Sequence, residues 1–303
     1  ELIDENYVVY AENGEDGLFR LKLFCVNPAV NLGEYLKKGR SAVFFSATLL
    51  PMNYYRKLLS NRQDDYGIYV ESPFSQKNRC ILNAGDVSSL YSRRGYEEYH
   101  KIAEYIARTV WQHKGNYMVF FPSYKMLEEV YAVYEEEFSV NWVKCICQNS
   151  SMKEQEREEF LQEFEQDQES LVAFCIMGGI FSEGIDLLGE KLIGAILVGT
   201  GLPQLGNERE ILRSFYTENG ENGFDYAYRY PGMNKVLQAA GRVIRTREDH
   251  GVILLLDERF RQREYSNLFP VEWNDRKTCT LSNVEAQLQK FWESIPDKIS
   301  HKL

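Results

Sequence analysis

Residues 171–186 read LVAFCIMGGIFSEGID, an apolar run that passes directly into a glycine-rich loop. The first six residues, Leu171–Ile176, are apolar without interruption, which is typical of a strand buried on both faces of a sheet. The glycines that follow permit an irregular backbone that can approach a ligand closely. Glu183 and Asp186 add carboxylates to the loop, although they could also simply cap a following turn. The stretch predicts a ligand-binding loop at the carboxyl end of a parallel strand.

On both sides of this stretch, apolar strands alternate with helical patterns. The predicted elements, in chain order, are a helix at Tyr96–His113, a strand at Tyr117–Phe121, a helix from Ser123 to about Phe138, a strand at Trp142–Cys147, a helix at Ser151–Phe164, strands at Leu171–Ile176, Leu192–Val198 and Gly251–Leu256, and a late helix at Asn283–Ser294. This alternation predicts an α/β fold, doubly wound, with a mainly parallel sheet and helices on both faces. Ligands bind such sheets at the carboxyl ends of the strands.

The amino-terminal part is less regular. Tyr7–Tyr10 and Leu18–Val26 flank an Asn-Gly turn and predict a hairpin. Ser41–Phe45 is a short apolar run that predicts a strand, and Met52–Leu59 predicts a helix. Residues 61–92 show few periodic signals and are interpreted as a connecting segment that includes short strands near Ile68–Val70 and Cys80–Leu82.

A second informative stretch, residues 238–245, reads QAAGRVIR within a helix predicted over residues 231–244. On a helix Gln238, Arg242 and Arg245 are at i, i+4 and i+7, so they project from one face. Two guanidinium groups on one stripe suit a phosphate chain, because each offers a planar fork of donors. A stripe of surface salt bridges explains the same pattern equally well.

A third stretch, SATL at residues 46–49, follows the predicted strand Ser41–Phe45. In their order, the three stretches resemble motifs III, V and VI of superfamily-two helicases. The XPD/DinG branch is indicated by EGID at residues 183–186, GTGLP at 199–203 and the aromatic run FDYAY at 224–228. Tyr117–Phe121 and the Pro-Ser that follows resemble motif IV, and the resemblance covers about Cys25 to Arg263.

This resemblance implies a RecA-like second motor domain, which has the P-loop NTPase-like fold but lacks the phosphate-binding loop. Residues 1–52 would be the tail of the first motor domain, and residues 53–303 would form the second. The implied activity is that of an ATP-dependent DNA helicase, with 5′-to-3′ translocation on single-stranded DNA. The partners would be DNA with a single-stranded part and the first motor domain of the same polypeptide.

The resemblance also assigns roles to the arginine stretch. Gln238, Arg242 and Arg245 would face ATP held by the first motor domain, as the catalytic residues of this half. One or both arginines would act as the finger that stabilises charge on the transferring phosphate.

Two further sets of residues take cofactor and coupling roles from the resemblance. The loop residues Glu183, Gly184 and Asp186 would couple the bound nucleotide to the DNA track. Ser46 and Thr48 would link the two motor domains.

Three residues at a strand-to-helix turn are implied to contact DNA. Ser123, Tyr124 and Lys125 would meet the DNA backbone at a helix N-terminus, where backbone N–H groups attract phosphate. The Tyr124 ring could instead stack on a base or simply pack against the surface.

The dipeptide Gly-Lys does not occur in the sequence, so there is no Walker-type phosphate loop. ATP and Mg²⁺ would therefore be bound mainly by the first motor domain. Asp257-Glu258 after an apolar strand imitates a Mg²⁺-binding strand end, but it is interpreted as an ordinary strand terminus. An iron–sulfur cluster, which many members of the family hold, would lie upstream, and none is expected in this chain. Cys145 and Cys147 share a strand face, but reduced core cysteines are favoured there over a metal site.

The formal net charge of −10 counts against a generally basic nucleic-acid binder, although a narrow basic track on an acidic body is compatible with it. No apolar run approaches the roughly 18 residues of a membrane helix, and no secretory signal is visible. Most of the six cysteines lie in apolar, strand-like segments, which favours reduced core cysteines and predicts a cytoplasmic protein.

Two alternatives belong to other functional classes. One is a non-catalytic nucleic-acid- or protein-binding module on a helicase-derived fold, which would have no need of the arginine stripe. The other is a doubly wound small-molecule enzyme that uses Glu183 and Asp186. The residues alone do not distinguish DNA from RNA or fix the direction of translocation.

Overall fold

The structure is a computed structural model that describes residues 4–296, except 15, 61, 63, 167 and 183–186. The chain divides into two compact units. The first comprises Glu1–Val70 and Pro203–Pro231, and the second comprises Glu71–Leu202 and Gly232–Leu303. This division differs from the boundary expected at residues 52–53, because residues 53–70 and 203–231 pack with the opening segment. None of the described helices is both long and apolar enough to cross a membrane.

The described part of the first unit contains a hairpin, three α-helices and a π-helix. Strands β1 (Tyr7–Asn13) and β2 (Phe19–Cys25) pair antiparallel, as the hairpin signal predicted. The α-helices are α1 (Ala29–Leu36), α2 (Met52–Leu59) and α6 (Asn207–Glu218), and a short π-helix spans Asp225–Arg229.

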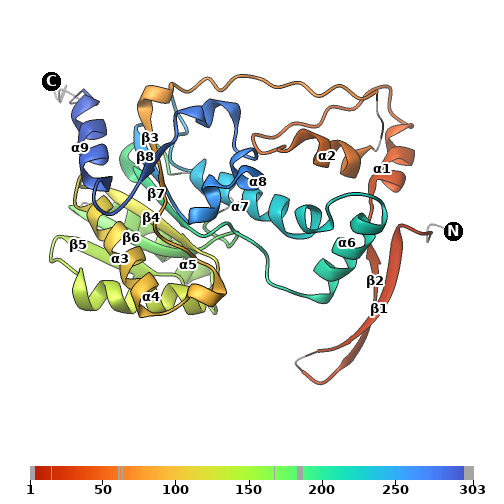
Figure 1. Ribbon diagram of the computed structural model, residues 1–303, viewed down its shortest axis with the longest axis horizontal. Helices are drawn as coiled ribbons and strands as arrows, with labels where there is room; N and C mark the ends of the chain where they lie inside the picture. Colours follow the sequence, from red (N-terminus) through yellow and green to blue (C-terminus); the bar gives the residue numbers. More distant parts are fainter. Residues whose placement is uncertain are drawn as a thin grey trace. The chain divides into compact units, whose positions relative to one another are not determined.

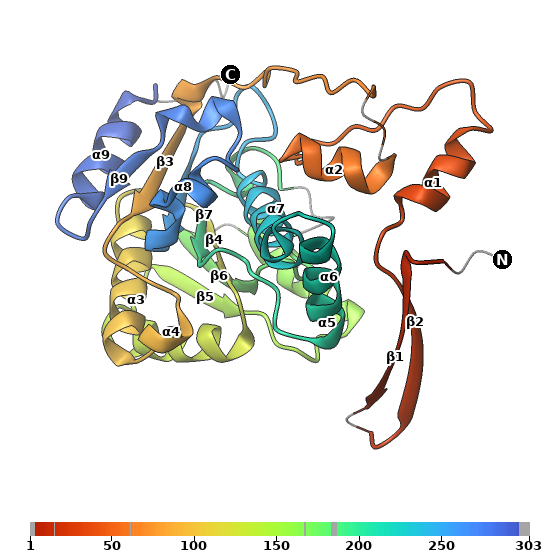
Figure 2. The same ribbon diagram turned by 45° about the vertical axis from the view of Figure 1, so that its right-hand side comes forward.

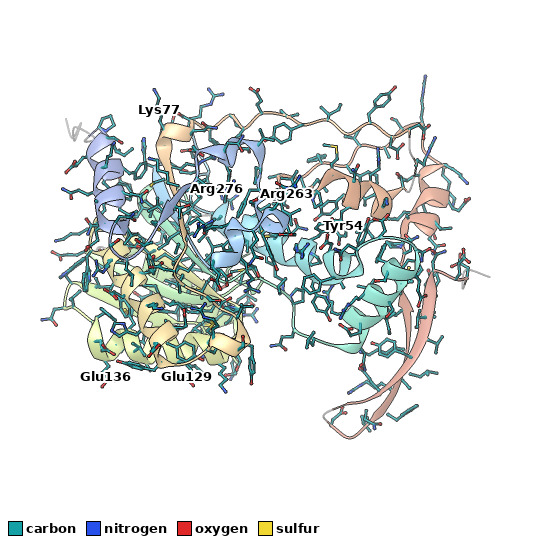
Figure 3. All side chains as sticks on the ribbon, in the orientation of Figure 1. Tyr54, Lys77, Glu129, Glu136, Arg263 and Arg276 are labelled. Atoms are coloured by element: carbon teal, nitrogen blue, oxygen red, sulfur yellow. The ribbon has the colours of Figure 1, made fainter. Side chains whose placement is uncertain are left out.

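A cluster of tyrosine rings forms the core of the first unit. Tyr54 of α2, labelled in Figure 3, lies with its ring centroid 5.2 Å from that of Tyr226 and 5.0 Å from that of Tyr230. Tyr216 of α6 stacks on Tyr226 at 4.0 Å. These offset and edge contacts tie residues 203–231 to α2, which explains why two distant segments form one unit.

The second unit is built on a seven-stranded sheet in the order β5-β6-β4-β7-β8-β3-β9, in which every pair is parallel (Figure 1). The strands are β3 (Arg79–Ala84), β4 (Asn116–Phe121), β5 (Val143–Cys147), β6 (Ser170–Ile176), β7 (Gly194–Val198), β8 (Gly251–Leu256) and β9 (Lys277–Cys279). The central strands β4, β7 and β8 are buried along their whole length, as their uninterrupted apolar sequences require.

Helices cover both faces of this sheet. They are α3 (Tyr96–Val110), α4 (Tyr124–Glu137), α5 (Glu154–Gln162), α7 (Tyr230–Ala240), α8 (Arg263–Ser266) and α9 (Val284–Ser294). The chain steps one way along the sheet from β3 to β5 and back from β5 to β8, so right-handed crossovers put the helices of the two legs on opposite faces. Accordingly α3, α4 and α9 share one core with the sheet, while α5 and α7 lie on its other side (Figures 1 and 2). This is the doubly wound, RecA-like arrangement that the sequence predicted.

Three sequence-based predictions of local structure are wrong. Ile68–Val70 forms no strand, whereas the strand near Cys80–Leu82 is confirmed as β3. Ser41–Phe45 forms no strand, and Val43 and Phe45 are 81% and 90% exposed. An apolar run becomes a strand only where a neighbour offers hydrogen bonds, and no described strand pairs with it. The helix predicted to reach residue 244 ends at Ala240 instead.

Candidate nucleotide- and nucleic-acid-binding edge of the sheet

The carboxyl ends of β4, β5 and β6 meet at one edge of the second unit. After β4 the chain turns at Ser123, whose Oγ accepts the N–H of Met126 and caps α4. A serine cap is favoured here because it satisfies one of the N–H groups that a helix start leaves open. Lys125 in the first turn is exposed. The arrangement gives a capped helix N-terminus beside a cation, which is the local geometry expected for a phosphate contact.

Tyr124 is held by a buried glutamine from the neighbouring strand end. Gln148 follows β5 and is only 5% exposed. Its Nε2 donates to the Tyr124 hydroxyl at 3.0 Å, and its Oε1 accepts the N–H of Ile176 at 2.9 Å. The Tyr124 hydroxyl in turn lies 3.4 Å from the Asn149 carbonyl, to which it donates. One amide therefore joins the ends of three strands, and the Tyr124 ring is fixed rather than free to swing.

The loop after β6 folds back on itself and is held by Arg242. The hydroxyl and the N–H of Ser182 both donate to the Gly179 carbonyl, at 2.8 and 3.0 Å. The Ser182 carbonyl accepts from Arg242 Nε at 3.1 Å and from Nη2 at 2.9 Å. The arginine fork thus binds the backbone of the glycine-rich loop immediately before residue 183. Glu183, Gly184 and Asp186 lie outside the described residues.

Glycine makes a second contact between this loop and α7 possible. Gly178 has φ +73°, and a Cβ there would come within 2.7 Å of Lys235 Cδ. The side chain of Lys235 on α7 therefore lies over the loop where only a hydrogen projects. The glycine-rich loop and α7 pack as one piece.

The expected common face of Gln238, Arg242 and Arg245 does not exist as a helical stripe. Gln238 is on α7, but the backbone N–H of Arg242 reaches back only three residues, to Ala239, so the chain has left the α-helix. Gly241 lowers helix propensity at this point. The three side chains are placed by a helix end and a turn rather than by helical periodicity.

A buried carboxylate shapes the turn that carries Arg245. Asp249 is 4% exposed and accepts the N–H groups of Arg245 and Thr246 at 2.8 and 2.7 Å, and the Thr246 hydroxyl at 2.7 Å. Burial opposes ionisation of Asp249, but these hydrogen bonds outweigh it and lower its pKa. The captured N–H of Arg245 cannot continue a helix, which explains the early end of α7 in physical terms.

The strand end of β7 also approaches α7 closely. Gly201 has φ +67°, and a Cβ there would lie 2.5 Å from the Gly232 carbonyl oxygen; one at Gly232 would lie 2.7 Å from the Thr200 carbonyl oxygen. Two facing glycines therefore let the backbones of the β7 end and α7 touch. This contact positions the helix that carries Gln238.

Asp257, after β8, is an ordinary strand terminus, as interpreted from the sequence. It is fully buried and accepts from Arg259 Nε and Nη2 at 2.8 Å each and from the Ser89 hydroxyl at 2.6 Å. Burial alone would raise its pKa, but Arg259 and Ser89 reverse the effect, so the pKa is lowered. All of these contacts are internal, so the carboxylate locks two strand ends together.

The cysteine pair on β5 shows no feature of a metal site. Burial raises the pKa of Cys145 and Cys147 to about 12, which opposes the thiolate form that binds metals. Among residues 4–296 that the structure describes, no group of three or more potential ligands is assembled.

Ser46 and Thr48 lie in the first unit, in a turn. Their hydroxyls are 3.3 Å apart, and the Thr48 N–H donates to Ser46 Oγ at 3.2 Å. The turn is formed as a local motif, and its proposed role between motor domains stays a prediction.

Three residues of the candidate site were missed by the sequence argument: Gln148, Ser182 and Asp249. A lone Gln after a strand has no distinctive spacing. Ser182 acts through its carbonyl, which no side-chain pattern reveals. Only Asp249 had a signal, since Thr-x-x-Asp spacing is typical of a hydrogen-bonded turn.

Comparison with known proteins places this geometry in a family. The helicase C-terminal domain family matches residues 106–276, which include α4, the glycine-rich loop, α7 and both arginines. The chain belongs to the helicase C-terminal domain family.

Curated relatives of this helicase C-terminal domain share much of its length at modest identity. The regulator of telomere elongation helicase 1 homolog of Culex quinquefasciatus is 27% identical over 301 residues, covering 90% of this chain and 30% of that protein. The Caenorhabditis elegans homolog is 23% identical over 317 residues, covering 93% and 31%. The chain thus spans about 30% of the length of these relatives.

Solved structures share the fold. A structure described as XPD helicase superposes with a TM-score of 0.65 at 18% identity, over 91% of this chain and 48% of that one. Xpd4 of S. tokodaii gives a TM-score of 0.51 at 17% identity, over 72% and 41%. The chain therefore has the fold that the resemblance to the XPD/DinG branch implied.

Proposed function

We propose that this helicase C-terminal domain is the second half of an ATP-dependent motor that translocates on or unwinds DNA. The first half would be a separate domain of the same polypeptide that carries the phosphate-binding loop. The observation that carries the proposal is the fork of Arg242 on the Ser182 carbonyl, because it joins the arginine stretch to the glycine-rich loop. A pure scaffold has no evident need for that link.

The two arginines take different tasks in this proposal. Arg242 uses Nε and Nη2 on the loop, so its task is to transmit movement between α7 and the loop after β6. Arg245, on the turn folded by Asp249, is the residue we assign as the finger. ATP supplies the phosphoryl group whose transfer to water drives the motor. A guanidinium beside that group stabilises the negative charge that develops on its oxygens.

The residues present suit a nucleotide that is bound from one side. Glycine-rich strand ends and two guanidinium groups offer close backbone approach and positive charge, but the sequence has no loop that could wrap phosphates. ATP and Mg²⁺ would therefore be held mainly by the first motor domain. An iron–sulfur cluster, if the protein has one, would also lie upstream.

DNA would run along the carboxyl ends of β4, β5 and β6. The capped N-terminus of α4 and Lys125 would contact the phosphates, and the Tyr124 ring, held by Gln148, would lie against a base or sugar. Ser46 and Thr48 would contact the first motor domain. The six reduced cysteines fit a cytoplasmic location.

The proposal is tested by ATP turnover in the presence of single-stranded DNA. The chain alone should hydrolyse little ATP, because its finger acts on phosphate held by another domain. The polypeptide that includes the upstream domain should show turnover stimulated by single-stranded DNA. Robust hydrolysis by the chain alone would refute the half-motor assignment. A joined protein that binds DNA but hydrolyses nothing would favour a non-catalytic binding module.

A further inference from the structure

A basic cavity lies at the opposite edge of the sheet from the strand ends described above. It has a volume of about 410 Å³ and is lined by the turn before β3, the first residue of β9 and the last turns of α9. These are the amino ends of β3 and β9, and all the residues that line the cavity belong to the second unit. Its size is within the usual range of small-ligand pockets, roughly 300–1,000 Å³.

Three lysines surround the cavity: Lys77, Lys277 and Lys290. Each is exposed, and Lys77 is labelled in Figure 3 on the turn before β3. None of the three ammonium groups forms an ion pair with a carboxylate in the part of the chain that the structure describes. In a chain whose formal net charge is −10, three neighbouring unpaired lysines are a local reversal of charge.

An incompletely paired arginine lines the same cavity. The side chain of Arg79 is 7% exposed and lies 3.7 Å from Asp275 Oδ1, beyond hydrogen-bond distance. Its Nη2 donates to the Glu272 carbonyl, but its buried Nε has no hydrogen-bond partner among the described residues. Asp275 Oδ1 is likewise buried without a hydrogen bond. Burial lowers the pKa of Arg79, which reflects the cost of holding this cation away from water.

Two of the three lysines have a structural explanation when taken singly. Lys277 is on the edge strand β9, where a charge discourages pairing with other chains. Lys290 is near the end of α9, where a cation complements the helix dipole. Neither reason explains the buried, incompletely bonded Arg79, or why Lys77 on a separate element joins the same cavity. An anion in the cavity would satisfy all four cations together.

We propose that this cavity binds a compact polyphosphate, a small molecule with two or more linked phosphate groups. The three ammonium groups would contact the phosphate oxygens from three sides, since lysine binds phosphate as a point charge. Phe291 also lines the cavity and would face a small apolar or planar part of the ligand. None of the residues that line the cavity is assigned above to the nucleotide, and the proposal does not depend on that assignment.

A compact ligand fits better than the backbone of a nucleic acid. The cations converge on one cavity from three elements, whereas a polymer track needs a line of charges that extends past the pocket. Asp275 on the wall would also repel a continuous phosphate chain, while a small ligand can turn its charged end toward the lysines.

The test is calorimetric titration of the chain with inorganic pyrophosphate. We expect saturable binding at one site. The triple variant Lys77→Gln, Lys277→Gln, Lys290→Gln should lose affinity by about a hundredfold, because three charged contacts disappear. The matched control is Lys114→Gln, Lys144→Gln, Lys191→Gln, which makes the same change of net charge at surface pairs with Glu169, Glu163 and Glu165.

The control triple variant should bind pyrophosphate within about twofold of the parent, because these pairs lie outside the cavity. Asp275→Asn should bind more tightly, since it removes the repelling charge from the wall. Equal losses in the two triple variants, or no saturable binding by the parent, would overturn the proposal. The proposal would also be overturned if a single-stranded oligonucleotide displaced pyrophosphate and its binding required the same three lysines. That result would assign the cavity to a nucleic-acid backbone.

Discussion

The two edges of the sheet in the second unit differ in how completely their buried and charged groups are paired. At the carboxyl edge, the described buried polar groups Gln148 and Asp257 each make two or more internal hydrogen bonds. At the amino edge, three lysines make no described ion pair, and Arg79 keeps an unbonded Nε beside Asp275. Both edges carry cations, but those that line the amino-edge cavity are incompletely paired.

The difference separates two ways of preparing a site. Internally bonded groups hold backbone and side chains in place before any ligand arrives, which suits an edge that must transmit movement. Lysines without an ion-pair partner suit an edge that receives its counter-charge from a ligand. If this comparison is right, substitutions at the carboxyl edge should affect stability or turnover, whereas those at the amino edge should affect ligand binding alone.

The largest effect is expected at Arg245. In the protein that includes the first motor domain, Arg245→Ala should lower DNA-stimulated ATP turnover by roughly a thousandfold or more, the usual effect of removing an arginine finger. DNA binding should remain close to that of the parent. Arg247→Ala is the matched control, because Arg247 is an exposed arginine two residues further on. Equal turnover in the two variants would mean that the turn held by Asp249 is organised but takes no part in the chemistry.

The next largest effect is expected on stability. It tests whether the ion pair between Asp257 and Arg259 serves to hold the fold. Asp257→Asn should lower the free energy of unfolding by about 3–5 kcal/mol, because it leaves the half-buried Arg259 without its carboxylate. Glu258→Gln, which touches only an exposed pair with Arg93, should change it by about 1 kcal/mol or less. Urea unfolding of both variants measures the difference.

The same carboxylate predicts a pH dependence. The pKa of Asp257 is lowered in the folded chain, so its contribution to stability is present above the unfolded pKa of about 4 and is lost as pH falls through the lower folded pKa. The parent should therefore lose stability in acid more steeply than Asp257→Asn. Parallel pH profiles for the two proteins would contradict this account.

Structural features that depend on interactions between residues close in sequence could be predicted, and those that depend on distant residues could not. The strands and most helices followed from apolar periodicity, which is local; Met52–Leu59 was predicted to the residue. The end of α7 was not, because it is set by Asp249, nine residues beyond Ala240. Ser41–Phe45 failed for the related reason that strand pairing needs a partner which sequence does not specify.

The candidate site shows the same limit. The sequence indicated Arg242 and the glycine-rich loop separately, and the structure joins them through the Ser182 carbonyl, sixty residues away in the chain. Gln148 has no sequence signal at all, since its role comes from three strand ends that meet only after folding. Motif spacing thus indicates which chemistry is present, whereas long-range hydrogen bonds decide how it is held.

A smaller effect is expected at the glycine contact that positions α7. Gly201→Ala should lower the free energy of unfolding by about 1–3 kcal/mol, because φ is +67° and the new Cβ would meet the Gly232 carbonyl. Gly95→Ala is the control, since its φ of 168° is extended and the position is open. Thermal unfolding of the two variants should differ; if they do not, the close approach of β7 and α7 contributes little to the organisation of the carboxyl edge.

The smallest effect is expected at Gln148, which accepts the N–H of Ile176 and donates to the Tyr124 hydroxyl. Gln148→Leu should lower the free energy of unfolding by about 1–2 kcal/mol, because the N–H of Ile176 loses its acceptor as well as Tyr124 its donor. Tyr124→Phe removes only the hydroxyl and should cost about 1 kcal/mol or less. If Tyr124 contacts DNA and Gln148 holds it in place, Gln148→Leu should also weaken binding of a single-stranded oligonucleotide several-fold, while Tyr124→Phe, which keeps the ring, should weaken it less. Fluorescence anisotropy measures the oligonucleotide affinity of both variants. If Tyr124→Phe loses as much affinity as Gln148→Leu, DNA binding depends on the hydroxyl and not on the placement of the ring.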